Sequence, residues 1–147
     1  MTEFLIGIFT AAISTLGFSL LFRVDKKYLL WGVLGGALSW AVYLAVEMVL
    51  LNTFVSAIAS AVVATVYSEM LAYALHTPAT VFLLPSLIPM VPGSSLYYTM
   101  SNLIMKDYAM AAEKGIQTIE VMLGLSGGVV AASLIFYAIR HIKRKKH

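Results

Sequence analysis

The sequence has no cysteine and very little charge. Its 147 residues include ten Lys and Arg and seven Asp and Glu, so charged residues make up 12% of the chain. Without cysteine there is no disulfide framework, no thiolate metal site and no cysteine nucleophile. Soluble domains contain roughly 25% charged residues, so this chain has too little polar surface to cover a globule in water. The composition excludes a soluble enzyme, a nucleic-acid-binding domain and a disordered tail.

Long uncharged stretches take the place of that polar surface. Hydrophobic residues make up 61% of the chain, and its mean hydropathy is +0.89. A helix that crosses a bilayer needs about 20 mostly apolar residues, and the chain has five uncharged stretches of about that length or longer. We therefore predict an all-α integral membrane protein, a single membrane domain over residues 1–147. The five spans are expected at about residues 4–22, 28–51, 54–75, 79–105 and 116–139. The first lacks a basic leading segment and a cleavage signal, which predicts a retained span and not a signal peptide.

The basic residues indicate how the spans are oriented. Eight of the ten Lys and Arg lie in the loop at 23–27 or in the tail at 140–147, which five spans would place on the same side. The opposite side receives only Lys106 and Lys114. By the positive-inside rule this predicts an external N-terminus and a cytoplasmic tail, in the cell membrane. We interpret the basic tail as an anchor at an anionic lipid leaflet and not as a nucleic-acid-binding segment.

Small residues recur every four positions on three of the predicted spans. Stripes of this kind let helix backbones approach closely in lipid, so they predict helix packing more than substrate contact. The stripes are Gly32 and Gly36, with Gly35, Ser39, Tyr43 and Glu47 beside them; Ser56, Ser60 and Ala64; and Gly124, Gly128 and Ala132.

The fourth span contains a dense group of helix breakers. Pro85, Pro89 and Pro92 fall within eight residues and are followed by Gly93. Each proline removes a backbone donor, and its ring clashes with the carbonyl four residues earlier. We therefore expect two half-helices that meet at Pro92-Gly93 near the bilayer midplane. The alternative is a proline-kinked structural helix, or a re-entrant pair that serves only packing.

A half-helix that starts inside the membrane is a candidate substrate site. Its first amides lack intrahelical acceptors and attract anions, and secondary transporters hold substrate carboxylates at such breaks. Ser94 or Ser95 is the expected N-cap. A zwitterion or a dicarboxylate would suit this arrangement. The candidate substrate-binding residues are Pro89, Pro92, Gly93, Ser94, Ser95, Tyr97 and Asn102.

Glu69 lies well inside the third span. Intramembrane ionisable groups are functional candidates by default, and a carboxyl group in low-dielectric surroundings holds its proton more tightly. We hypothesise proton coupling through Glu69, with a neutral structural glutamate as the alternative. Tyr73 and His76 follow at i+4 and i+7 on the same helix face. Glu47 and Glu120, near span ends, are interpreted as structural.

Catalytic and metal-binding motifs are missing from the sequence. It contains no H-E-x-x-H, no G-x-S-x-G and no Walker A motif. Histidine occurs only at 76, 141 and 147. We therefore predict a protein that is not an enzyme and that has no cofactor and no metal site.

The chain resembles the threonine/serine exporter family. The most specific part of the likeness is the stretch from Pro85 to Ser95, which contains Val91-Pro92-Gly93. The size of the chain and its five predicted spans agree with it. The likeness is closest to the short YjjB-like type, which works with a longer YjjP-like membrane subunit. The family exports threonine and serine or, in the two-subunit type, dicarboxylates such as succinate. Single-chain members have about twice as many spans and a soluble N-terminal region. The resemblance thus implies a half-transporter that needs a partner chain. A non-transporting scaffold or accessory subunit, and a self-sufficient exporter of identical chains, remain open.

Overall fold

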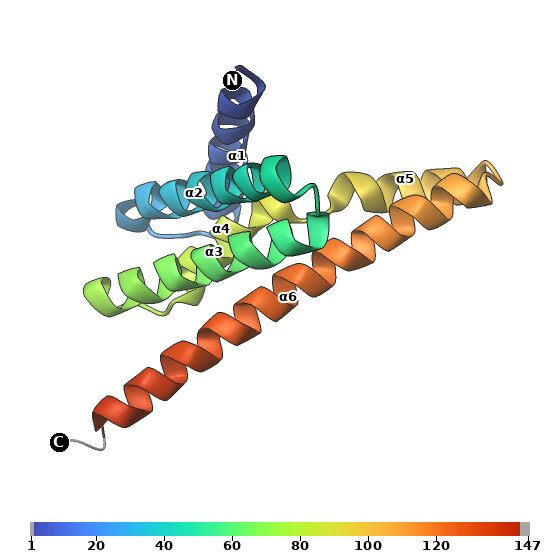
Figure 1. The fold of residues 1–147 in the computed structure, drawn as a ribbon. Helices are drawn as coiled ribbons and strands as arrows, with labels where there is room; N and C mark the ends of the chain where they lie inside the picture. The colour runs from blue at the N-terminus through green and yellow to red at the C-terminus, as the bar shows by residue number, and fades with distance from the viewer. Residues whose placement is uncertain (1, 145–147) are drawn as a thin grey trace.

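A computed structural model describes residues 2–144, and every regular element in that range is a helix (Figure 1). The elements are α1 (Thr2–Leu21), α2 (Lys26–Leu50), α3 (Thr53–Leu75), α4 (Thr80–Leu87), the short 3₁₀ helix η1 (Ile88–Met90), α5 (Gly93–Ile104) and α6 (Tyr108–Arg144). Among the described residues, four helices are long and apolar enough to cross a membrane, and α4 with α5 forms a bent pair that would make a fifth span. The predicted all-α membrane fold is confirmed. The last part of the basic tail, 145–147, lies outside the described residues.

The helices pack around α2 and α3, which are antiparallel neighbours. α1 packs on α2, α4 contacts both α2 and α3, and α6 lies along α3. α5 packs on the first part of α6. Figure 1 shows these two segments running together past the ends of α2 and α3. We call this projection, residues 93–120, the α5–α6 arm.

The core of the described chain consists mainly of small residues, with Phe82 and Met90 as large apolar side chains among them. The predicted stripes are confirmed, because their glycine, serine and alanine residues on α2, α3 and α6 are all buried. A Cβ added to Gly36 would overlap the buried Thr15 side chain of α1, and one added to Gly128 would lie 2.7 Å from the Ile58 carbonyl oxygen. Large apolar side chains such as Phe9, Leu30 and Val49 face outwards. This distribution is typical of helices packed in lipid.

The turns between helices do not use glycine. Arg23, Leu51, His76 and Lys106 adopt positive φ angles of 54°, 48°, 51° and 62°, whereas no glycine has positive φ. Glycine is usual at such helix ends because it has no Cβ. Several glycines, such as Gly36, Gly124 and Gly128, lie instead in the helix interfaces, where a close approach requires them.

The start of α6 differs from the prediction. The sequence placed a loop before a span beginning near residue 116, but α6 begins at Tyr108. Asp107 explains the difference, since its Oδ1 accepts the Met110 N–H at 3.2 Å and its carbonyl accepts the Ala111 N–H at 3.0 Å. Glu120 therefore lies well inside α6, too far from its start to interact with the amides of the first turn.

Candidate functional site

The break in the fourth span has the predicted position and an unpredicted cap. After η1, Val91 is extended, and the helices on either side are bent by 47°. α5 begins at Gly93 with Pro92 as its N-cap, and the Pro92 carbonyl accepts the Leu96 N–H at 3.0 Å. The expectation that Ser94 or Ser95 caps the helix was wrong. No side chain caps α5, because its N-cap residue, Pro92, has no side-chain oxygen to accept a backbone N–H.

The first turn of α5 faces open space. A Cβ built on Gly93 would meet nothing within 4 Å, and Ser94 is exposed. The Ser95 hydroxyl donates to Gln117 Oε1 of α6 at 3.4 Å. Tyr97 is 67% exposed. Gly93, Ser94 and Tyr97 therefore lie on the surface of α5 that α6 does not cover.

The remaining predicted site residues have mainly structural contacts. Pro89 lies in η1, before the break. Asn102 lies in the last turn of α5, and its carbonyl accepts the Asp107 N–H at 2.9 Å in the turn to α6. The structure thus places Asn102 several turns from Pro89, at the opposite end of α5.

Glycine contacts show how far along the bundle the break lies. Gly124 of α6 packs against Ala57 and the Phe54 carbonyl, and Gly128 packs against Ala61 in the next turn of α3. Residues of α6 before about 120 therefore extend past the first residue of α3, as Figure 1 shows.

Pro92 lines a mostly apolar groove of ≈ 380 Å³ with residues 122–130 of α6. The break is thus level with the first two turns of α3, nearer to one end of the α2–α3 pair than to its middle. From the sequence, the break was expected at Pro92-Gly93 near the bilayer midplane; its level along α3 depends on the register between α3 and α6, which the sequence did not show.

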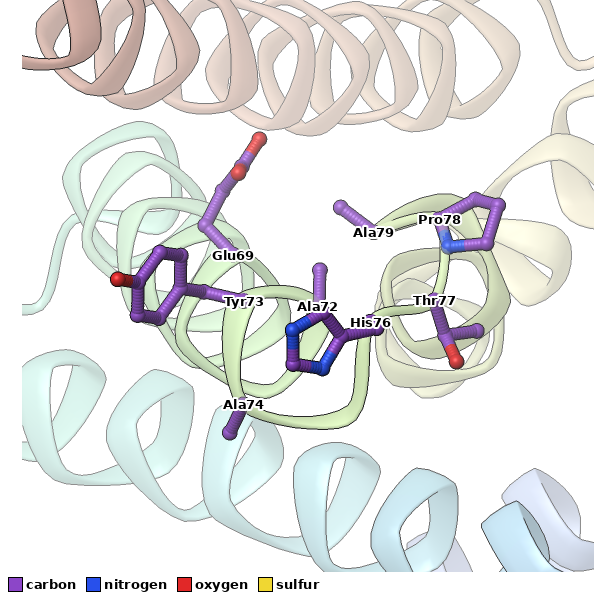
Figure 2. A pocket seen from close by; sticks show the side chains of 8 residues that line it. All are labelled: Glu69, Ala72, Tyr73, Ala74, His76, Thr77, Pro78 and Ala79. Carbon is purple, nitrogen blue, oxygen red and sulfur yellow. The ribbon is translucent and has the colours of Figure 1, made fainter.

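A second group of polar residues lies at the other end of α3. A pocket of ≈ 680 Å³ opens there, between the last turns of α3 and the start of α4 (Figure 2). His76 ends α3, and the Thr77 hydroxyl donates to the Tyr28 hydroxyl at 2.8 Å, which ties this turn to α2. The pocket is lined by Glu69, Ala72, Tyr73, Ala74, His76, Thr77, Pro78 and Ala79.

Glu69 lies where this pocket meets the interface with α6. Figure 2 shows its carboxylate pointing towards α6, while the Tyr73 ring points in a different direction. Glu69 also lines a groove of ≈ 420 Å³ with Ser133, Phe136 and Tyr137 of α6. The structure thus brings Glu69, Tyr73 and His76 around one pocket, as expected. It does not bring them to the break, which lies near the other end of α3.

Sequence reasoning missed the contacts of Glu47, which it interpreted as a structural residue near the end of a span. Glu47 Oε2 accepts a hydrogen bond from the Ser56 hydroxyl at 2.7 Å, and Oε1 accepts one from Thr53 at 3.2 Å. The repeat of Gly35, Ser39, Tyr43 and Glu47 was the available signal. Gly35 and Ser39 are buried, so this repeat marks a face of α2 that turns towards the bundle.

Apolar helices, a core of small residues and a helix broken within an apolar stretch together define a multi-pass membrane protein. Secondary transporters are built in this way. The family described as threonine/serine exporter matches residues 7–135, so the chain belongs to this family. This confirms the family resemblance and makes the chain a transporter of the threonine/serine exporter type. No curated protein and no solved structure matches it.

Proposed function

We propose that this chain is one half of a secondary transporter that exports small carboxylate-bearing metabolites. The candidates are threonine and serine, or dicarboxylates such as succinate. The observation that carries the proposal is the start of α5, where Gly93 has no atom within 4 Å of its Cβ position and Ser94 is exposed. A helix N-terminus attracts a carboxylate through its first amides and its dipole. In a transporter of this family, that open helix start is suited to hold the carboxylate of the solute.

The site residues divide into two groups in this proposal. Pro89, Pro92 and Gly93 shape the break and keep side chains away from the amides. Ser94 and Ser95 offer hydroxyls, while Tyr97 covers the solute and Asn102 lies farther along α5 on its path.

A second chain completes the site, because α6 leaves most of α5 uncovered and no residue of this helix is buried. Tyr97, Met100 and Ile104 are 67%, 56% and 81% exposed, and a partner chain would cover them. The proposed partner is a longer YjjP-like membrane subunit or, as the alternative, an identical chain. Repeats of opposite orientation commonly surround the substrate site of secondary transporters. We propose the cell membrane as the location, with the N-terminus outside, from the unequal distribution of Lys and Arg.

Glu69 is the proposed proton-coupling group. It lines the pocket at the end of α3 and the groove along α6. A change in its charge would therefore alter the electrostatic interactions of both helices. Coupled transport needs a group of this kind, whose charge biases one arrangement of the helices over another.

Counterflow in liposomes tests the proposal. The full chain is reconstituted with and without a candidate larger subunit, and labelled serine, threonine and succinate are offered. Gly93→Leu is compared with Gly127→Leu, because both glycines have open space around the Cβ position. We expect exchange of at least one solute, lost in Gly93→Leu and kept in Gly127→Leu.

Two results would contradict the proposal. Absence of exchange under every condition, with the larger subunit present, would favour a scaffold or accessory role. Exchange that Gly93→Leu leaves intact would remove the start of α5 from the substrate path.

A further inference from the structure

A pocket that the proposed transport site does not use lies between the loop after α1 and the start of α4. Its volume is ≈ 430 Å³, and it is lined by residues 22–25, by Tyr28 of α2 and by residues from the segment 77–85. Figure 1 shows the start of α2 and the end of α3 at the same end of the bundle. The start of α5 is level with the opposite end of α3, so this pocket is a separate site.

Contacts within the protein hold the walls of this pocket in place. The Arg23 N–H donates to the Leu20 carbonyl at 3.1 Å, which closes the end of α1. The Thr77 hydroxyl is hydrogen-bonded to the Tyr28 hydroxyl at 2.8 Å, and the Tyr28 ring packs edge to face on the buried Phe82. A ligand would therefore meet a pocket whose shape is already formed, which lowers the cost of binding.

Basic side chains outnumber acidic ones at the pocket. Arg23 lines it and is exposed, and the Lys27 ammonium lies 4.6 Å from the centre of the Tyr28 ring. Asp25 also lines the pocket, but the loop at 23–27 carries three basic residues and this one acidic residue. In the described chain, Arg23 and Asp25 form no ion pair with each other. The Arg23 guanidinium has five donors in a planar fork that suits phosphate oxygens.

Two helix starts at the pocket add to this positive charge. Asp25 is the N-cap of α2 and Ala79 that of α4, and neither side chain makes a cap hydrogen bond. The first two residues of α4, Thr80 and Val81, line the pocket. The first amides of a helix lack intrahelical acceptors, and the helix dipole favours a negative group beside them. Both helix starts therefore act in the same direction as Arg23 and favour an anion.

One side of the pocket is apolar and open to the surroundings of the bundle. Phe22 and Leu84 line it and are 50% and 54% exposed. Thr80 and Leu84 are four residues apart on α4 and share a helix face, so a hydroxyl and an apolar side chain follow each other along the pocket. Arg23 directly follows the uncharged first span, at the level expected for lipid headgroups. A phospholipid has the same order of groups, a charged phosphate followed by acyl chains.

We propose that this pocket binds one anionic membrane phospholipid. The lipid phosphate accepts hydrogen bonds from the Arg23 guanidinium and the Thr80 hydroxyl, and an acyl chain lies along Phe22 and Leu84. Basic pockets between membrane helices bind anionic headgroups in this way. The bound lipid joins the loop after α1 to α4, so it should stabilise the folded chain. The inference does not depend on the proposed substrate site.

Native mass spectrometry of the full chain in detergent tests the site, because it resolves each bound lipid molecule. The protein is titrated with phosphatidylglycerol, which is anionic, and with phosphatidylcholine, which is zwitterionic and has the same acyl chains. Glycerol phosphate offers the phosphate without acyl chains, and succinate offers carboxylates. We expect one saturable adduct with phosphatidylglycerol, weaker binding of phosphatidylcholine, and no displacement of the lipid by either soluble anion.

Single variants connect the adduct to the pocket. Arg23→Gln removes a charge-assisted hydrogen bond and should weaken the first phosphatidylglycerol binding step about 10-fold, while Arg23→Lys should restore part of the affinity. Lys106→Gln is the matched control, because Lys106 is a basic residue that also has a positive φ, of 62°, in the turn between α5 and α6. It should bind the lipid as wild type does. Asp25→Asn removes the acidic group of the pocket and should not weaken binding.

Four results would overturn the inference. Equal phosphatidylglycerol affinity in wild type and Arg23→Gln would exclude Arg23 as the phosphate-binding group. An equal loss in Arg23→Gln and Lys106→Gln would reduce the effect to the net charge of the protein. Displacement of the lipid by glycerol phosphate or succinate would assign the pocket to a soluble anion. Weaker phosphatidylglycerol binding in Asp25→Asn, or equal binding of phosphatidylcholine, would show that the pocket does not select a negative headgroup.

Discussion

The close contact between α3 and α6 leads to a sharp prediction for neighbouring glycines on one helix. In Gly128→Ala, the new methyl group would lie 2.7 Å from the Ile58 carbonyl oxygen and 2.8 Å from the Ala61 Cβ. The oxygen belongs to the helix backbone and cannot rotate away. Ordinary contacts begin at about 3.4 Å, so α6 has to move out by about 0.7 Å.

The cost follows from the loss of packing along the α3–α6 interface. Overpacking of this kind costs about 1–3 kcal/mol, and alanine returns up to about 1 kcal/mol through its higher helix propensity. We therefore expect Gly128→Ala to lower the free energy of unfolding by up to about 2 kcal/mol. Gly127→Ala is the control, because nothing lies within 4 Å of its Cβ position. It should leave stability unchanged or raise it by up to about 1 kcal/mol.

Thermal unfolding of the two variants in the same detergent measures this difference. Ala61→Gly in the Gly128→Ala background should restore only part of the stability, because the Ile58 carbonyl remains in place. Equal melting temperatures of Gly127→Ala and Gly128→Ala would contradict the close contact between α3 and α6.

Three further predictions concern coupling, local stability and orientation. Glu69→Gln should keep substrate counterflow but reduce transport driven by an imposed proton gradient about 10-fold or more; full gradient-driven transport would remove the coupling role. Tyr28→Phe loses the hydrogen bond from Thr77, so it should lower the melting temperature, by less than Gly128→Ala does. Because the chain has no cysteine, Lys26→Cys and Lys106→Cys can each be labelled singly in intact cells. An impermeant maleimide should react with the second variant and not the first, and the reverse pattern would invert the proposed orientation.

The helices and their packing faces were largely predictable. Uncharged stretches of about 20 residues must form helices in lipid, because every backbone polar group there needs an internal partner. The repeat of Gly124, Gly128 and Ala132 predicted a packing face, since only small residues permit a close approach. The group of prolines before Gly93 predicted a break for an equally local reason.

The ends of elements were less predictable. α6 begins at Tyr108 because Asp107 caps it. This capping signal is local, but the charged residues around Asp107 led the segment to be interpreted as a loop. α5 begins after Pro92 without a side-chain cap. Several residue types compete for a cap within one turn, and small energy differences decide among them.

The amino-acid order alone determined that this protein is a helical membrane protein with a broken fourth span, because hydropathy, residue size and proline act within a few positions. The register between α3 and α6 was decided only in three dimensions. That register places the break near one end of the bundle and Glu69 towards the other. The hydroxyls of Thr53 and Ser56 that hold Glu47 likewise come from the next helix, and only the folding of α2 against α3 brings them to the carboxylate.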